Sequence, residues 1–241
     1  GLSSSAAVEV ATLRAAAALF DKPVDPVDFA VKARAVENDY VGMPCGIMDQ
    51  FAVSVGAPGT ALFLDTRTLD YHPAPLPEGH SVLVIDSGVV HRHTTGGYPQ
   101  RVAECAEARE ALGVEMLSDL GTEDLDRIAA LRDPLNRRAL HVVTDNRLAR
   151  AGLDALRAGD AKTFGRLMTE SHATERDNYE ITVPETDALV EAALAAGALG
   201  ARQTGGGFGG AVLVLVEDGA ADELADQLTK TFPDTRLLAV A

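Results

Sequence analysis

Apolar residues recur along the chain with two spacings, and together they predict a protein built from both helices and strands. Apolar positions three and four residues apart predict helices, over residues 6–20, 25–38, 48–55, 98–113, 122–131, 134–158, 160–176, 184–196 and 220–231. Short apolar runs between turn residues predict strands, over residues 60–64, 69–72, 81–85, 201–204, 211–216 and 236–240. The last elements form a β-loop-β-α-β unit, and a boundary between two lobes is expected near residues 86–100.

The first helix follows a serine-rich start. Residues 6–20 are apolar except at Glu9, Thr12 and Arg14, so this helix is expected to be buried on most sides. Gly1-Leu2-Ser3-Ser4-Ser5 precedes it and offers N–H groups and hydroxyls at the positive end of the helix dipole, where a phosphate or a magnesium ion can bind. A serine N-cap with two spare serines accounts for the same residues, so this pattern alone leaves both interpretations open.

A rigid turn precedes the helix expected over residues 48–55. The segment Val41-Gly42-Met43-Pro44-Cys45-Gly46 cannot continue a regular element because of its glycines and proline. Asp49 therefore falls at or near a helix N-terminus, where backbone N–H groups and the helix dipole favour an ionised carboxylate. Such a carboxylate suits either a helix cap or a base that meets a substrate hydroxyl.

Glu37 lies near the end of the helix that Asp25 and Pro26 begin. A carboxylate at a helix C-terminus opposes the dipole and costs stability unless a cation is near. A divalent metal would supply that charge, and an exposed glutamate is the alternative.

Two loops carry further candidate ligands. Residues 86–99 contain His91, Arg92, His93 and Tyr98, and the arginine between the histidines favours a sugar or phosphate contact over a metal site. A second loop, Thr204-Gly205-Gly206-Gly207-Phe208-Gly209-Gly210, has more glycine than a hairpin needs. Its backbone can approach a phosphate or another backbone closely, unless it is simply a flexible turn.

Composition narrows the class of partner. The 241 residues carry a net charge of −15, which disfavours nucleic acid and anionic membrane surfaces. Two cysteines make no disulfide framework, no apolar run reaches the length of a membrane span, and no signal-peptide pattern is present. A cytoplasmic protein is expected. The chain starts without Met inside what looks like a working loop, so we expect a fragment of a longer polypeptide.

Three of these segments together resemble the GHMP small-molecule kinases, and within that family the galactokinases. The family's second motif ends in Gly-Leu-Ser-Ser-Ser-Ala, as in Gly1 to Ala6, and its third motif matches residues 204–210. The galactokinase branch carries Cys-Gly-Ile-Met-Asp-Gln, as in Cys45 to Gln50, and residues 170–172 and 184–185 also look alike. The resemblance covers the whole chain. It implies an α+β fold, with the remainder of a ribosomal protein S5 domain 2-like N-lobe at residues 1–90 and a ferredoxin-like C-lobe at residues 91–241.

The resemblance also implies a role for each matched residue in a monomeric enzyme that transfers phosphate from ATP to the C1 hydroxyl of galactose. Asp49 would be the catalytic base, with Gly46, Asp49 and Tyr98 as sugar contacts. Mg²⁺ would be held by Ser5 and Glu37. ATP would contact Gly1, Leu2, Ser3, Ser4, Ser5, Gly205, Gly206 and Gly207. Arg92 lies where the family has an arginine near the sugar, although its spacing to Tyr98 is shorter here.

The sequence departs from the family at its first motif, Gly-Arg-x-Asn-Leu-x-Gly-Glu-His-x-Asp-Tyr, which has no counterpart in the chain. In the family that segment supplies the catalytic arginine and most sugar contacts, so the 241 residues by themselves are expected to be inactive. Three alternatives stay open: a kinase for N-acetylgalactosamine or arabinose, a sugar- and ATP-binding sensor that regulates transcription through a partner, and a structural fragment without function of its own.

Overall fold

The computed structural model describes residues 2–42, 45–89 and 97–241, and the chain divides into two compact units. Unit 1 comprises residues 1–76 and unit 2 comprises residues 77–241. This division falls earlier than the lobe boundary expected at 90/91, because the strand at His80–Asp86 pairs with strands from the C-terminal part of the chain.

The described residues of unit 1 form three helices, a π-helical turn and a hairpin. Asp25 caps the second helix, because its carboxylate accepts the backbone N–H groups of Val27 and Asp28 at 2.9 and 3.3 Å. The two strands pair in antiparallel register from Thr60 opposite Pro75 to Leu64 opposite Tyr71. The elements are α1 (Ser4–Leu19), α2 (Pro26–Ala35), η1 (Val36–Val41), α3 (Met48–Val55), β1 (Thr60–Leu64) and β2 (Tyr71–Pro75).

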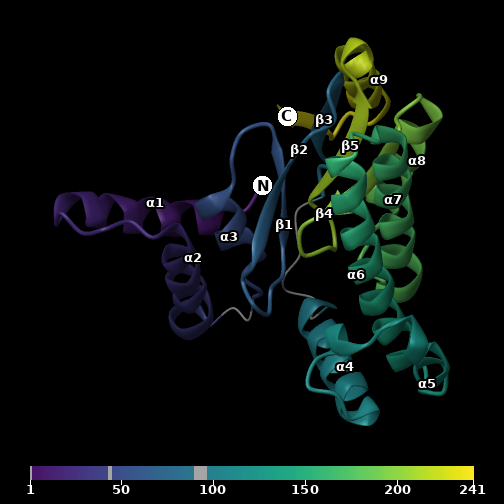
Figure 1. The fold of residues 1–241 in the computed structure, drawn as a ribbon. Helices are drawn as coiled ribbons and strands as arrows, with labels where there is room; N and C mark the ends of the chain where they lie inside the picture. Colours follow the sequence, from purple (N-terminus) through teal and green to yellow (C-terminus); the bar gives the residue numbers. More distant parts are fainter. Residues whose placement is uncertain (1, 43–44, 90–96) are drawn as a thin grey trace. The chain divides into compact units, whose positions relative to one another are not determined.

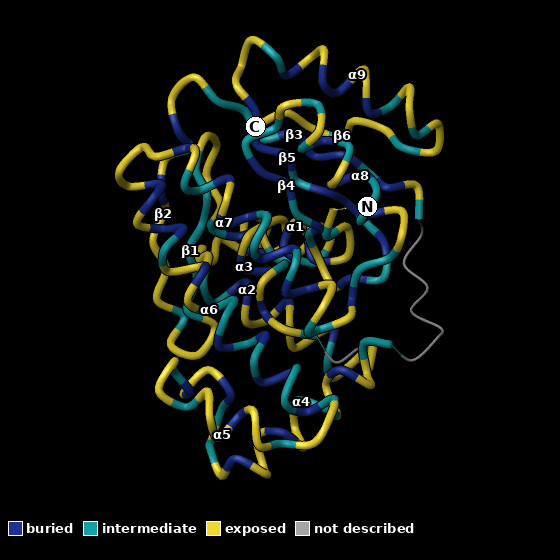
Figure 2. The backbone as a smooth tube through the Cα atoms, turned by 90° about the vertical axis from the view of Figure 1, so that its right-hand side faces the viewer, coloured by how far each residue is buried: buried dark blue, intermediate teal, exposed yellow. Residues whose placement is uncertain are grey.

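The core of unit 1 is small, and α1 takes little part in it. Among the described residues of this unit, Ala30, Ile47 and Phe51 form a buried cluster. The prediction that the first helix is buried on most sides is wrong: Val8 is 67% exposed and Leu19 is 78% exposed. The helix is apolar nearly all round, but within unit 1 only the face that meets α2 and α3 is covered. Figure 2 colours the described backbone by burial, and the alternation of buried and exposed positions along a helix is clearest in α9.

The described residues of unit 2 include a four-stranded antiparallel sheet with the order β4-β5-β3-β6. Figure 1 labels its strands β3, β4 and β5. The strands are β3 (His80–Asp86), β4 (Gly200–Thr204), β5 (Ala211–Glu217) and β6 (Arg236–Val240). The β4-loop-β5-α9-β6 order agrees with the expected unit. The structure adds β3 between β5 and β6, a long-range pairing that the local pattern did not indicate.

Both faces of β5 are covered, as the unbroken apolar run of this strand requires. Val212, Val214 and Val216 pack with residues of α8 and α9, whereas Leu215 packs with Ala161 and Met168 of α7. Figure 1 shows α6 and α7 running alongside each other, and α9 close to β3. The helices are α4 (Gly97–Leu112), α5 (Leu125–Ala129), α6 (Leu135–Arg157), α7 (Ala161–Thr174), α8 (Pro184–Ala195) and α9 (Ala221–Thr231).

Short turns of other helix types complete unit 2. Helix α7 continues into a π-helical turn, η5 (Glu175–Tyr179). In the described part of this unit, 3₁₀ turns lie at η3 (Leu117–Asp119), η4 (Thr122–Asp124) and η6 (Asp218–Ala220). Within the described ranges, none of the helices is both long and apolar enough to cross a membrane.

Candidate active site

The serine-rich start of the chain leads directly into α1. Ser3 holds the N-cap position in a left-handed conformation, with φ of 48°, and its side chain makes no capping hydrogen bond. The simple serine-cap interpretation is therefore wrong for Ser3. Leu2, Ser4 and Ser5 are exposed at this helix end, where unpaired N–H groups and the helix dipole favour an anion. Gly1 lies outside the described residues.

Two carboxylates from separate helices meet beside Ser5. The Ser5 hydroxyl donates to Oε1 of Glu37 in η1, and Glu37 is buried. Glu9 lies one helical turn beyond Ser5, and its pKa is raised first by burial and then by a hydrogen bond and charge repulsion from Glu37. Glu9 Oε2 is a buried atom without a partner among the described residues.

This group fits a magnesium ion in its chemistry. Mg²⁺ prefers oxygen ligands and is usually held by one or two carboxylates, with phosphate and water filling the other positions. Ser5 and Glu37 provide such oxygens, and a cation would offset the repulsion that raises the pKa of Glu9. Groups of three or more His, Cys, Asp or Glu side chains that could hold a metal ion are not found in the described part of the chain.

Asp49 is the second residue of α3 and is half-buried. The helix cap is Ile47, and no side chain caps it, so the predicted capping role of Asp49 is wrong. Its place in the first turn, where the helix dipole favours a negative charge, agrees with the prediction. A carboxylate that is not used for capping keeps its oxygens available for a substrate hydroxyl.

Side chains of α2 and η1 hold the turn before Asp49. Asn38 Oδ1 accepts the N–H of Cys45 at 2.9 Å, and Arg34 Nε donates to the Cys45 carbonyl at 3.2 Å. Gln50, which is buried, donates from Nε2 to Cys45 Sγ at 3.8 Å. The backbone that leads through Gly46 to Asp49 is therefore attached to α2 and to η1, the element that carries Glu37.

The glycine-rich loop of unit 2 has a defined shape. Gly205 and Gly207 have φ of 90° and 84°, a region open to glycine at little cost. The Phe208 N–H donates to the Ile181 carbonyl at 2.6 Å. A Cβ added at Gly207 would lie 2.6 Å from Cβ of Ile181. The alternative of a flexible turn does not agree with these contacts.

The loop also contacts the start of α4. A Cβ added at Gly97 would lie 2.6 Å from Cζ of Phe208, so the phenyl ring rests directly on that glycine. Tyr98 Cδ2 lies 4.0 Å from the Cβ position of Gly206. The structure thus brings Tyr98 and the glycine-rich loop together within unit 2. Arg92, with His91 and His93, lies outside the described residues.

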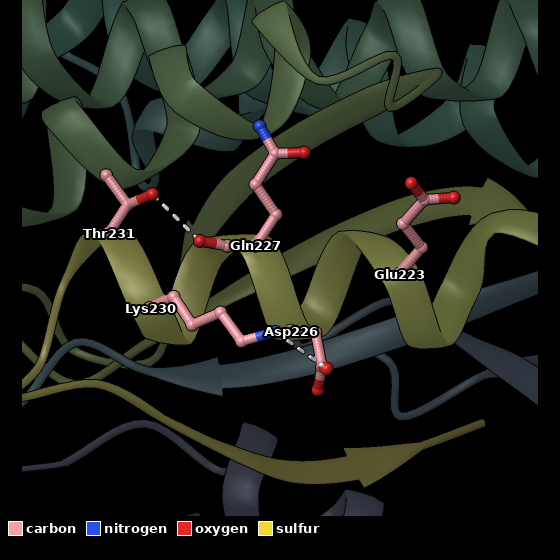
Figure 3. Close-up of a pocket in the computed structure, with 5 residues that line it drawn as sticks. All are labelled: Glu223, Asp226, Gln227, Lys230 and Thr231. Carbon is pink, nitrogen blue, oxygen red and sulfur yellow. Dashed lines mark hydrogen bonds and ion pairs between the residues drawn. The ribbon is translucent and has the colours of Figure 1, made fainter.

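A shallow pocket elsewhere in unit 2 does not belong to this site. It is lined by exposed polar residues of α9 alone (Figure 3). Lys230 pairs with Asp226 at 3.2 Å, and the Thr231 hydroxyl donates to the Gln227 carbonyl at 2.8 Å. These are ordinary interactions along the surface of a helix.

Sequence reasoning missed Glu9 as a neighbour of the candidate metal ligands. The signal was available, because Glu9 is the one acid in the apolar run over residues 6–20 and lies four positions after Ser5, on the same helix face. It also assigned no role to the charged residues around Glu180, whose partners come from helices far apart in the sequence.

Comparison with known proteins gives these arrangements a family. Residues 1–57 match the GHMP kinases N terminal domain and residues 153–234 match GHMP kinases C terminal. A galactokinase of Thermococcus kodakarensis is 41% identical over 98% of this chain and 67% of its own length. A galactokinase of Chloroflexus aggregans is 45% identical over 92% of this chain and 59% of its own length.

A solved structure shares the fold over nearly the whole chain. The Lactococcus lactis galactokinase complexed with galactose superposes with a TM-score of 0.90 at 30% identity, over 97% of this chain and 64% of that one. A mevalonate kinase of L. major reaches 0.65 at 19% identity, which indicates the fold alone.

These matches show that the chain belongs to the GHMP small-molecule kinases, with the mixed α and β fold of that family. Within the family it belongs with the galactokinases, as the motifs at residues 1–6, 45–50 and 204–210 predict. The chain spans about two thirds of the length of the curated relatives it matches.

Proposed function

We propose that the protein to which these residues belong phosphorylates galactose at the C1 hydroxyl, with ATP as the phosphate donor. The observation that carries this proposal is Asp49 in unit 1. It is a half-buried carboxylate that does not cap its helix, and it follows a turn attached to α2 and η1. The same unit holds the Ser5–Glu37 pair at the start of α1. The identity to galactokinases directs the choice of sugar.

ATP phosphates bind at two glycine- or serine-rich segments in this proposal. The N–H groups of residues 2–5 at the start of α1 provide donors for phosphate oxygens. Gly205, Gly206 and Gly207 provide a backbone without side chains that a phosphate can approach closely. Both segments would bind the charged phosphates, and neither contains the proposed base or a nucleophile. This suits phosphoryl transfer, because that reaction depends mainly on positioning and charge neutralisation.

Ser5 and Glu37 would hold Mg²⁺. When bound, the ion neutralises charge on the phosphates and orients them. Glu37 is placed for this role by η1, and its bond from Ser5 keeps the two ligands together. Glu9 adds negative charge beside them and would increase the attraction for a cation.

Asp49 accepts the proton of the C1 hydroxyl as the oxygen attacks the γ-phosphorus of ATP. A bond forms between the sugar oxygen and phosphorus, the bond from phosphorus to the β–γ bridging oxygen breaks, and ADP leaves. Gly46, which is exposed and precedes Asp49, and Tyr98 are the proposed sugar contacts.

Unpaired cysteines and an acidic surface support a cytoplasmic location. Cys45 and Cys105 are both free thiols, as expected in a reducing compartment. We take a monomer as the working state of the enzyme.

An ADP-release assay across several sugars tests the proposal. We expect a polypeptide extended to the full length of the curated relatives to release ADP with galactose, and with N-acetylgalactosamine and arabinose at least tenfold more slowly. Faster ADP release with N-acetylgalactosamine or arabinose would identify that sugar, instead of galactose, as the substrate. Binding of sugar and ATP without ADP release would instead identify a sensor. The 241-residue chain, assayed in parallel, is expected to be inactive.

A further inference from the structure

Two buried arginines of unit 2 bind the backbone at the end of η5. Arg138 of α6 donates from Nη1 to the Asn178 carbonyl at 2.5 Å, and Arg101 of α4 donates from Nε to the Tyr179 carbonyl at 2.6 Å. Arg101 also reaches the Glu180 carbonyl, at 3.2 Å from Nη2. Three consecutive carbonyls at a helix end, which have no partner within the helix, are thus bound by guanidinium groups that also match the negative end of the dipole.

One carboxylate is shared by the two buried cations. Glu104 Oε2 accepts Arg138 Nε at 2.6 Å and Arg101 Nη1 at 2.8 Å. Burial alone raises the pKa of Glu104, but hydrogen bonds from Arg138 and Gln100 outweigh it and keep the pKa below its ordinary value. Arg138 is 1% exposed, and its Nε, Nη1 and Nη2 atoms each donate a hydrogen bond. It is therefore a buried charge with partners rather than one half of a surface ion pair.

Glu180 turns the chain out of the helix. Its φ of 55° lies in the left-handed region, which residues with a Cβ rarely adopt because of steric strain. Its N–H closes the helix end on the Glu175 carbonyl. Its carboxylate accepts Arg137 Nη1 at 2.5 Å and Arg138 Nη2 at 2.6 Å. The arginines therefore hold both the carbonyls and the side chain of the strained turn.

The next residue, Ile181, is hydrogen-bonded to the glycine-rich loop. The Ile181 carbonyl accepts the N–H of Phe208 at 2.6 Å and Nε2 of Gln203 at 3.2 Å. The Ile181 side chain fills the space where Gly207 has no Cβ. The orientation of this one peptide group therefore fixes both where the loop begins, at Gln203, and where it turns, at Phe208.

We infer that Arg101 and Arg138 are positioning residues for the phosphate-binding glycine loop, acting through the carbonyls of residues 178–180 and the peptide of Ile181. They are not among the residues proposed to contact phosphate or sugar. Their role is to keep the Phe208 N–H bound to Ile181, so that residues 205–207 present one backbone shape to a ligand. The inference deepens the proposed function, since the meaning of that shape rests on ATP binding there.

Hydrogen exchange of the Phe208 amide in the 241-residue chain tests the inference without any activity measurement. Arg138→Lys keeps the charge, but a single ammonium cannot reach Glu104, Asn178 and Glu180 in the fork geometry of a guanidinium. We expect the Phe208 amide to exchange at least tenfold faster, while amides in the centre of β5 change less than threefold. Arg166→Lys, at an exposed ion pair on α7, is the matched control and should leave Phe208 unchanged.

A second variant separates the backbone contacts from the side-chain ion pair. Glu180→Gly adopts the left-handed turn readily and keeps the three carbonyls, but loses the carboxylate. We expect Phe208 exchange to stay within threefold of the unchanged chain. Equal acceleration of Phe208 and β5 amides in Arg138→Lys would mean loss of stability alone and would overturn the inference. Absence of kinase activity in the longer polypeptide would refute the proposed function and leave this exchange result intact.

Discussion

Asp49 provides the sharpest test at the scale of single residues. Asp49→Asn keeps the shape of the side chain and removes its ability to take a proton. In a polypeptide of the relatives' full length, we expect kcat to fall by about 10²–10⁴-fold, the usual worth of a general base. Nucleotide affinity should change little, because Asp49 is separate from the residues proposed to bind phosphate.

Calorimetric titration with Mg-ADP supplies the second measurement for this variant. The control is Asp39→Asn, a carboxylate in η1 of the same unit with no proposed role in proton transfer. A kcat within threefold of the unchanged enzyme in Asp49→Asn would remove Asp49 from the role of base.

His141 makes the stability of unit 2 depend on pH. The ring is buried, stacks on Tyr179 with centroids 4.4 Å apart, and lies 3.3 Å from the Thr174 hydroxyl. Burial lowers its pKa below the ordinary value of 6.5, and nearby Asp145 and Glu175 offset this only in part. As the pH falls below about 6.5, the unfolded chain takes up the proton first, so the free energy of unfolding declines until the folded-state pKa is reached.

His141→Gln removes that titration. Between pH 7 and pH 5 we expect the unchanged chain to lose more stability than the variant, by at most about 1.4 kcal/mol for each pH unit below 6.5. Urea unfolding at a series of pH values measures the difference. His72→Gln, on the exposed strand β2, is the control. Parallel pH profiles for the unchanged chain and His141→Gln would contradict the prediction.

At the scale of elements, two helical glycines of unit 2 should respond oppositely to the same substitution. Gly152 in α6 has room, since an added Cβ would meet only the Phe164 ring at 3.5 Å. Gly165 in α7 has none, since its Cβ would lie 2.6 Å from the carbonyl carbon of Leu199. Helix α7 packs directly on β4 through the close approach of Gly165 and Gly200.

We expect Gly152→Ala to stabilise the chain by up to about 1 kcal/mol through helix propensity. Gly165→Ala gains the same propensity but must push α7 away from β4, at a cost of roughly 1–3 kcal/mol or more. Urea unfolding monitored by far-UV circular dichroism compares the two variants. Equal effects of the two substitutions would mean that the α7–β4 contact is not tight.

Periodicity and turn residues predicted most of these elements, because each depends on neighbours in the sequence. The strands at 60–64 and 236–240 have the bounds that alternation and turns indicate. The strand expected at 69–72 instead begins at Tyr71, because Leu69 takes a left-handed φ of 63° in the preceding turn. The insertion of β3 into the sheet was not predictable, since its partners lie more than 100 residues away.

The candidate site likewise contains residues that local sequence could identify and residues that it could not. Asp49 and Glu37 could be proposed from the sequence because each was expected at a helix end, where the interaction of a carboxylate with the helix dipole points to a functional role. The capping role of Asp49 was mistaken because a helix that begins at Met48, as predicted, has Ile47 at the cap position and Asp49 inside the first turn. Arg101 and Arg138 carried no signal, because their roles arise from contacts with residues 178–180 made only by packing of α4 and α6 against η5.

At the scale of the whole molecule, the two units differ in how much apolar surface each buries in its own core. Unit 2 has a sheet covered on both faces and the larger clusters of buried residues. Unit 1 buries few large side chains and carries most of the exposed large hydrophobic residues of the described chain, including Val8, Leu19, Phe20 and Tyr40. Burial of apolar surface is the main favourable term in folding, so unit 1 has less of it to offset the entropy of its ordered chain.

We therefore expect urea to unfold the 241-residue chain in two steps, with unit 1 first. Hydrogen exchange should locate the first step in α1 to α3 and the second in β3 to β5. The polypeptide 77–241 alone should reproduce the second step with its midpoint unchanged, because both the sheet and its covering helices lie within it. A single transition, with amides of α2 and β5 losing protection at the same urea concentration, would mean instead that the two units stabilise each other, and 77–241 would then unfold at a lower concentration than the whole chain.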